Sequence, residues 1–110
     1  LCGEDMACQI LKSSELARER VAAGRLPRVE WTTIVDHIVH AAEVGGAAHV
    51  GLGSDFDGAD MPYGMEDVTR LPKITAALLE RGLSPDEVRG ILGGNLLRVL
   101  EQVEAVAAGH

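Results

Sequence analysis

Hydrophobic residues recur every three or four positions along most of the chain, which predicts a mostly helical protein. The first such stretch spans residues 4–24 and the second runs from residue 32 or 33 to residue 44. Gly24 predicts the end of the first helix, because glycine is frequent just beyond helix C-termini. Thr32 or Thr33 is expected to cap the second helix through its hydroxyl group.

Three more helices are expected in the carboxyl-terminal part of the chain. The third begins at Leu71–Pro72, where proline is tolerated in the first turn. The fourth begins with Ser84 and Glu87, whose spacing is that of a capping box, and it ends at Gly93–Gly94. Asn95 is expected to cap the last helix.

One segment between the second and third helices has a different period. Apolar and small residues alternate from Ala48 to Gly53, just before Ser54 and Asp55. Alternation with a period of two predicts one short buried strand, and the loop 56–65 follows it. A single strand cannot form a sheet, so this pattern is typical of a slice of an α/β protein. In a barrel enzyme, the carboxyl end of such a strand is where catalytic groups are held.

Composition excludes several classes of protein. The chain has 110 residues, of which 46% are hydrophobic and 25% charged, so it is neither disordered nor fibrous. Its net charge of −7, without a basic cluster, argues against nucleic acid or an anionic membrane as a partner. No apolar run reaches the ~18 residues of a membrane-spanning helix. A compact fold of this mass would expose roughly 6,000 Å².

The two cysteines, Cys2 and Cys8, lie six positions apart and could share a helix face or close a small loop. We expect reduced thiols, because two cysteines do not make a disulfide framework. Charge and cysteine content favour a cytoplasmic protein. Because the chain starts at Leu1, we expect that it begins inside a longer reading frame or follows processing.

The candidate chemistry lies at the end of the predicted strand. Asp55 and Asp57 place two carboxylates there, and such groups can serve as a general base, a metal ligand or an orienting group. Gly53 and Gly58 allow a close backbone approach or a sharp turn. A purely structural role is the alternative, in which both carboxylates bond to their own loop backbone.

A calcium-binding loop is a second alternative. Asp55, Asp57 and Glu66 have the spacing of positions one, three and twelve of such a loop. However, Ala59 occupies position five, the glycine stands at position four instead of six, and a predicted strand precedes the loop.

Five motifs in a fixed order resemble the carboxyl-terminal part of the membrane dipeptidase family (renal dipeptidase, peptidase M19), over about residues 31–103. The motifs are Asp-His-Ile-Val-His at 36–40, His-Val-Gly-Leu-Gly-Ser-Asp-Phe-Asp-Gly at 49–58, Gly-Met-Glu-Asp-Val at 64–68, Leu-Ser-Pro-Asp-Glu at 83–87, and Ile-Leu-Gly-Gly-Asn-Leu-Leu-Arg-Val at 91–99. A Ser-Asp-Phe-Asp-Gly run alone would not be specific.

The resemblance implies a metal-dependent (β/α)8 barrel of the amidohydrolase type that hydrolyses dipeptides. In that family, two zinc ions activate the attacking water. The family's aspartate at the end of the last strand corresponds to Asp55, which would accept a proton from the metal-bound water and pass it to the leaving amine. The implied active-site loop consists of Gly53, Ser54, Asp57 and Gly58.

This sequence departs from the family because the zinc-binding residues of the earlier strands are absent, so no metal ligand is expected in the chain. A complete barrel takes about 250 residues. Residues 1–28 are interpreted as an unassigned amino-terminal helix, and residues 29–110 as the last strand-helix unit and terminal helices of a barrel. His37 and His40 are expected on a helix surface or in packing, and His49 is expected to be structural.

Two functions follow from these observations. The first is a partial zinc-dependent dipeptidase, which would be inactive without the missing upstream strands. The alternative is a non-catalytic, mostly helical, acidic interaction module that associates with copies of itself, since a lone strand needs a partner.

Overall fold

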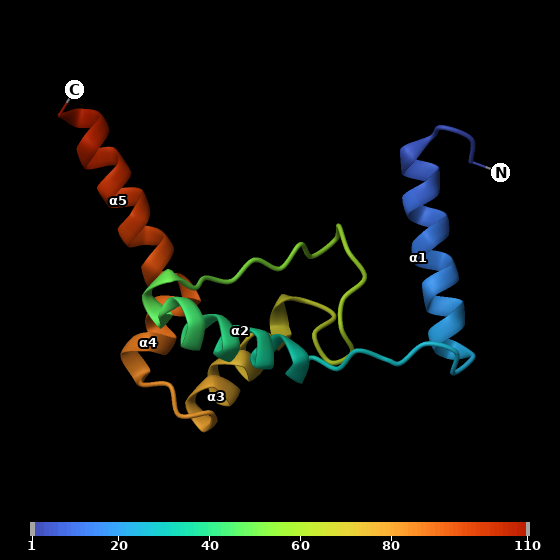
Figure 1. Cartoon of the computed structure of the whole chain (residues 1–110), viewed down its shortest axis with the longest axis horizontal. Coiled ribbons are helices and arrows are strands. Elements are labelled where there is room, and N and C mark those ends of the chain that lie inside the picture. Colours follow the sequence, from blue (N-terminus) through green and yellow to red (C-terminus); the bar gives the residue numbers. More distant parts are fainter. Residues whose placement is uncertain (1, 110) are drawn as a thin grey trace.

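The computed structural model describes residues 2–109, and helices dominate this part of the chain. The α-helices are α1 (Met6–Ala22), α2 (Thr32–Gly45), α3 (Pro72–Glu80), α4 (Pro85–Arg89) and α5 (Asn95–Ala108), joined in part by the 3-10 turns η1 (Ala47–His49) and η2 (Val68–Arg70) and the π-helical turn η3 (Gly90–Gly94). Helices α2, α3 and α4 cluster, whereas α1 stands apart at the end of an extended linker and α5 projects away from the cluster (Figure 1).

A small hydrophobic core holds the cluster together. Its buried side chains come from α2, α3, α4, η3 and the loop before η2, and they are Val35, Ile38, Met65, Ile74, Leu78, Val88 and Ile91. The apolar positions of α2 and α3 lie three or four residues apart, so each helix presents one stripe to this core. Met65 brings the long loop after residue 50 onto the same core.

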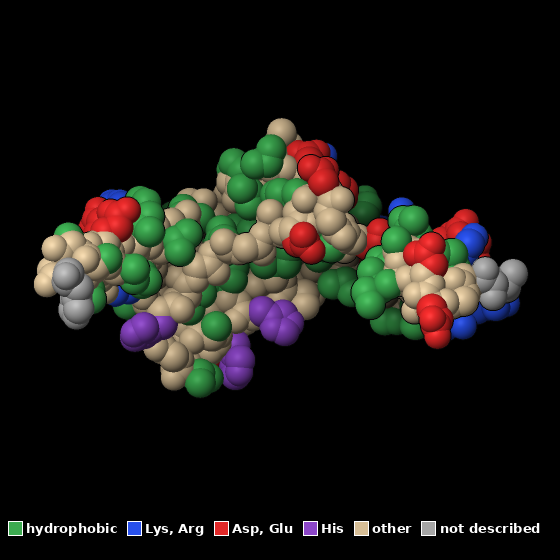
Figure 2. Space-filling view, turned by 90° about the horizontal axis from the view of Figure 1, so that it is seen from above, with side chains coloured by type: hydrophobic (Ala, Val, Ile, Leu, Met, Phe, Trp, Pro, Cys, Tyr) green, Lys and Arg blue, Asp and Glu red, His purple; other side chains and the backbone are tan. Residues whose placement is uncertain are grey.

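The chain exposes more surface than a compact protein of its mass. Its accessible surface is 8153 Å², compared with the roughly 6,000 Å² expected above. Helix α1 has no buried residue, and Met6 in its apolar stripe is 71% exposed. Helix α5 is similar along its length, with Leu96 near its start 69% exposed and Val103 60% exposed. Hydrophobic side chains are accordingly visible over much of the surface in Figure 2.

The structure confirms the five predicted helices, with bounds that differ by a few residues. The capping box is also confirmed: the Ser84 hydroxyl accepts from Glu87 N at 3.3 Å, and Glu87 Oε2 accepts from Ser84 N at 2.8 Å. The predicted threonine cap of α2 is wrong, because Trp31 occupies the N-cap and makes no side-chain bond there. Asp5 caps α1 by accepting from Cys8 N, which the sequence analysis missed.

The predicted strand is not confirmed within the described residues. Residues 47–49 form the turn η1, and the following segment, 50–55, has no ladder partner. Between residues 2 and 109, the only β pairing is an isolated parallel bridge between Glu30 and Tyr63. Alternation of side chains favours an extended backbone, but a strand exists only when a neighbouring chain accepts and donates its hydrogen bonds. The described residues therefore form a mostly helical arrangement, and the one recognisable strand expected of an α/β slice is not confirmed.

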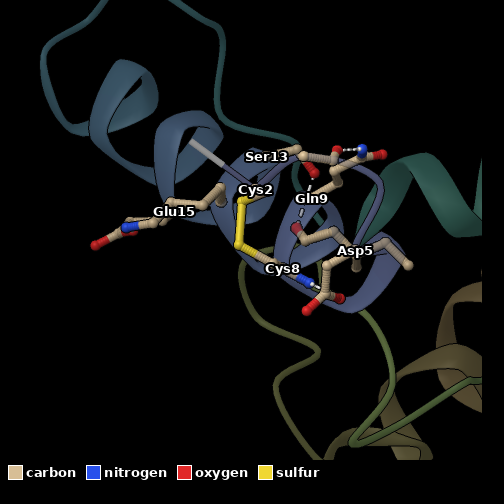
Figure 3. The surroundings of a disulfide bond; sticks show 9 residues. Cys2, Asp5, Cys8, Gln9, Ser13 and Glu15 are labelled. Carbon is tan, nitrogen blue, oxygen red and sulfur yellow. Dashed lines mark hydrogen bonds and ion pairs between the residues drawn. A yellow bond between two sulfur atoms is a disulfide. The ribbon is translucent and has the colours of Figure 1, made fainter.

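The expectation of reduced thiols is also wrong. Cys2 and Cys8 form a disulfide across a Cα–Cα distance of 5.5 Å, which is within the range that such a bridge needs. Figure 3 shows that the bridge lies at the start of α1, where the first helical turn carries Cys8 back over the preceding segment. Spacing in the sequence does not predict that distance.

In the part of the chain that the structure describes, no helix is both long and apolar enough to cross a membrane.

The capping box makes stability depend on pH. Hydrogen bonds from the backbone N–H and the hydroxyl of Ser84 lower the pKa of Glu87 from its ordinary value of 4.5. A lowered carboxyl pKa stabilises the folded state above the unfolded pKa, and this contribution is lost as the pH falls through the folded pKa. We therefore expect the unfolding free energy of the wild type to decrease more steeply below pH 4.5 than that of Glu87→Gln, in urea titrations. Parallel curves for the two proteins would contradict this assignment.

Candidate functional site

The segment that carries the candidate carboxylates has two different faces. Val50 and Leu52 are half-buried and pack against the hydrophobic core. Gly51 and Gly53, which alternate with them, are exposed, and a Cβ on either glycine would meet no atom within 4 Å. The alternation that suggested a strand therefore does separate an apolar side from an open side. Asp55 lies at the end of the segment, beside this open side.

The segment 50–55 follows a turn that is closed by a hydrogen bond between His49 and Gly45. Helix α2 ends at Gly45, and Gly46 takes a left-handed conformation with φ of 85°, which glycine adopts without a steric penalty. His49 Nδ1 lies 2.8 Å from the Gly45 carbonyl oxygen and donates to it, because a carbonyl can only accept. The expected structural role of His49 agrees with this contact.

Asn95 and Arg98 of α5 then hold the turn from outside. The Asn95 amide donates from Nδ2 to the carbonyl oxygens of Ala47 at 2.7 Å and Val50 at 2.8 Å, and Arg98 donates to that of Ala48 at 2.7 Å. The prediction that Asn95 caps the last helix is wrong: it has helical backbone angles and serves carbonyls 45 and 48 positions away. One sequence signal pointed to this role, because Asn95 is a polar residue in the middle of the largely apolar motif at 91–99.

Asp55 lies in a tight turn with an uncommon backbone. Its φ is 52° and that of Asp57 is 69°, in the left-handed region where aspartate is more frequent than most non-glycine residues. The Asp55 carbonyl accepts from Gly58 N at 3.0 Å and from Ala59 N at 3.1 Å. Each left-handed residue costs about 1 kcal/mol or more, and such residues are concentrated at functional sites.

Both carboxylates of this turn are exposed. Within residues 2–109, neither Asp55 nor Asp57 has a side-chain hydrogen bond or an ion pair; Ser54 is the residue whose side chain bonds the loop, since its hydroxyl accepts from Phe56 N at 3.3 Å. The alternative in which the two carboxylates bond to their own backbone is therefore wrong. A carboxylate without a partner is accessible to a ligand.

An apolar hollow of about 270 Å³ lies beside the loop. Leu52, Ser54 and Phe56 contribute one part of its wall, and Ile34 and Met65 contribute another. Phe56 is half-buried whereas its neighbour Asp55 is exposed. The loop thus places an apolar side chain in the wall of the hollow and an exposed acid in adjacent residues.

Glu66 serves a neighbouring turn instead of the Asp55 turn. Its carboxylate accepts from Gly64 N at 2.6 Å, and this bond, with smaller contributions from Arg70 and Lys73, lowers the pKa of Glu66. The Lys73 ammonium group donates to the Gly64 carbonyl at 3.0 Å. Gly64 itself has φ of 87°, and a Cβ there would lie 2.6 Å from the Trp31 ring. The sequence analysis missed this turn, in which the glycine and the glutamate of the third motif bond each other.

The described residues do not form a metal site by themselves. From residue 2 to residue 109, no group of three or more histidine, cysteine, aspartate and glutamate side chains comes together. The calcium loop is therefore not formed, because Glu66 bonds to Gly64 instead of joining Asp55. The side chains present here do not fit two zinc ions either. His37 and His40 are exposed on α2, and Figure 2 shows histidines on the surface of one face; His110 lies outside the described residues.

Comparison with known proteins identifies the family. Residues 21–110 match the sequence model of the membrane dipeptidase family (peptidase family M19). Dipeptidase tcpJ of Claviceps purpurea is 50% identical over 80 residues, which cover 70% of this chain and 18% of that protein. Dipeptidase ataJ of Aspergillus terreus and dipeptidase aclJ of Aspergillus oryzae are each 51% identical over 75 residues, covering 67% of this chain and 18% of each relative.

The chain therefore belongs to the membrane dipeptidase family, which confirms the resemblance carried by the five motifs. The matched part includes all five and begins inside the segment 1–28, which the sequence analysis left unassigned. The chain spans about a fifth of the length of the curated relatives that it matches.

The Asn95 contacts generate a testable prediction. Asn95→Asp keeps the size of the side chain but removes the donor and places a carboxylate against two carbonyl oxygens. We expect the free energy of unfolding to fall by about 1–3 kcal/mol in urea titrations at pH 7. Gln102→Glu makes the same amide-to-acid change at an exposed position of α5 and serves as the control. Equal losses in the two variants would show that the Asn95 amide does not hold the turn.

Proposed function

We propose that this chain is the carboxyl-terminal part of a dipeptidase with a (β/α)8 barrel, in which residues 50–53 belong to the last strand and Asp55 follows it. The two faces of this segment support the proposal. In a barrel, one face of each strand packs on the outer helices and the other points into the interior. Val50 and Leu52 pack on the helical core here, whereas Gly51 and Gly53 leave the other face open.

Asp55 is the proposed catalytic residue, and its exposed carboxylate without a partner is the observation that carries the proposal. At the end of a barrel strand, this group would lie among the catalytic groups. A carboxylate there can take a proton from the water that attacks the peptide bond and deliver it to the leaving amine. The turn around Asp57 and Gly58 would present the carboxylate to a dipeptide.

The zinc ions proposed for the complete enzyme require ligands from outside these residues. The side chains of residues 2–109 offer no group of three ligands, so we expect the chain alone to have no dipeptidase activity. The barrel strand and the catalytic role of Asp55 are both proposed for the complete protein. The chain covers 18% of the length of the Claviceps purpurea relative.

The alternative function is a non-catalytic module that associates with copies of itself. The exposed apolar side chains on α1 and α5 favour it, since such faces commonly mark protein interfaces. This alternative assigns no chemical task to Asp55. The test of the proposed catalytic residue therefore separates the two functions.

The test is Asp55→Asn in a chimera, in which residues 21–110 of this chain replace the matching part of the Claviceps purpurea dipeptidase. Asparagine has the same shape and also tolerates a positive φ, so the turn is retained. We expect kcat for dipeptide hydrolysis to fall by about 10²-fold or more, with bound zinc nearly unchanged. Asp86→Asn, an exposed acid on α4, is the matched control and should retain activity. Full activity of Asp55→Asn in an active chimera would remove Asp55 from the mechanism and favour the alternative.

A further inference from the structure

Gly58 stands against the carboxylate of Asp55. Its N–H donates to the Asp55 carbonyl at 3.0 Å and closes the turn. A Cβ added to Gly58 would lie 2.5 Å from Asp55 Oδ1, 3.1 Å from Cγ and 3.4 Å from Oδ2. Contacts under about 3.3 Å between a carbon and an oxygen are repulsive, so any side chain at position 58 and the present position of the carboxylate exclude each other.

The backbone does not require glycine at this position. Among residues 2–109, six glycines have positive φ, and Gly58 is not one of them, so alanine fits its conformation. The neighbouring glycines of the segment differ, because a Cβ on Gly51 or Gly53 would meet nothing within 4 Å. Among these three glycines, only Gly58 lies so close to the candidate catalytic group that a side chain there would clash with it.

We propose that Gly58 is a positioning residue for Asp55, an inference that rests on the proposed function of Asp55 as the group that transfers the proton. Because Gly58 has no side chain, the space beside it is available to the Asp55 carboxylate. A methyl group at position 58 pushes the carboxylate aside by rotation about its χ1 bond. This movement costs little stability, because the Asp55 side chain is exposed and has no partner within the described part of the chain. It moves the reacting oxygen by an ångström or more, and such a displacement can cost about 10²-fold in rate.

The first measurement follows the carboxylate directly in this chain. In NMR spectra of the uniformly ¹³C-labelled 110-residue protein, we expect Gly58→Ala to shift the Asp55 ¹³Cγ resonance and change its χ1-dependent couplings. The thermal unfolding midpoint should stay at the wild-type value. Gly53→Ala adds the same methyl group to the same segment in open space, and should leave the Asp55 resonance in place. An unchanged Asp55 resonance in Gly58→Ala, or equal changes in both variants, would overturn the inference.

The second measurement separates this inference from the proposed function. In the chimeric dipeptidase, we expect Gly58→Ala to lower kcat by about 10²-fold with KM within about twofold. Gly45→Ala, also in open space but at the end of α2, is the control that should keep wild-type kcat. If the Asp55 resonance shifts but Gly58→Ala and Asp55→Asn both keep full activity, the positioning stands and the catalytic role of Asp55 fails. If Asp55→Asn is inactive and Gly58→Ala is fully active, Asp55 is catalytic and the positioning inference is wrong.

Discussion

The hydrogen bonds from the Asn95 amide to the carbonyls of Ala47 and Val50 determine where the rest of the site lies. They connect the start of α5 with the turn that follows α2, two parts of the chain far apart in sequence. Val50 is the first residue of the segment that leads to Asp55, so its direction depends on this contact. The π-helical turn η3 joins α4 to α5 and contains Gly93 at φ of 159°. Asn95 follows this turn directly, and its side chain lies within hydrogen-bond distance of both carbonyls. The hydrophobic core fixes the helices, and Asn95 fixes the segment to them.

The segment 50–55 is supported on one side only. Its apolar side chains contact the core, and the Val50 carbonyl accepts from Asn95. Within the described residues, its glycine face is open and its backbone pairs with no neighbouring strand. The large accessible surface and the exposed stripes of α1 and α5 have the same character, since each is an apolar surface without a partner. A barrel in which other strands pair with this segment would account for its open edges. It would also give Asp55 the surroundings of an active site, as we propose.

Sequence periodicity predicted the helices because each carries apolar residues at helical spacing, which is a local pattern whether or not the stripe is buried. Ser84 with Glu87 predicted the start of α4 because a capping box is also local. The strand is not confirmed, since side-chain alternation indicates only which residues share a face, whereas strand pairing depends on residues elsewhere in the sequence. Long-range contacts were missed for the same reason. Asparagine is a common helix-capping residue, and nothing in the local sequence shows that the fold brings the carbonyls of Ala47 and Val50 to Asn95. Asp55 was selected as a candidate from the motif alone, whereas its closeness to Gly58 is visible only in the three-dimensional structure.

Amide hydrogen exchange tests the central claim, that this segment is extended and held from one side without strand pairing. The backbone N–H groups of residues 51–55 have no hydrogen-bond partner within residues 2–109, whereas those of buried α2 and α3 residues bond within their helices. We predict exchange close to the rate of an unfolded peptide for residues 51–55, and strong protection at Val35, Ile38 and Leu78. Protection of residues 51–55 equal to that of these core positions would contradict the account, because it would mean that the chain already pairs this segment as a strand.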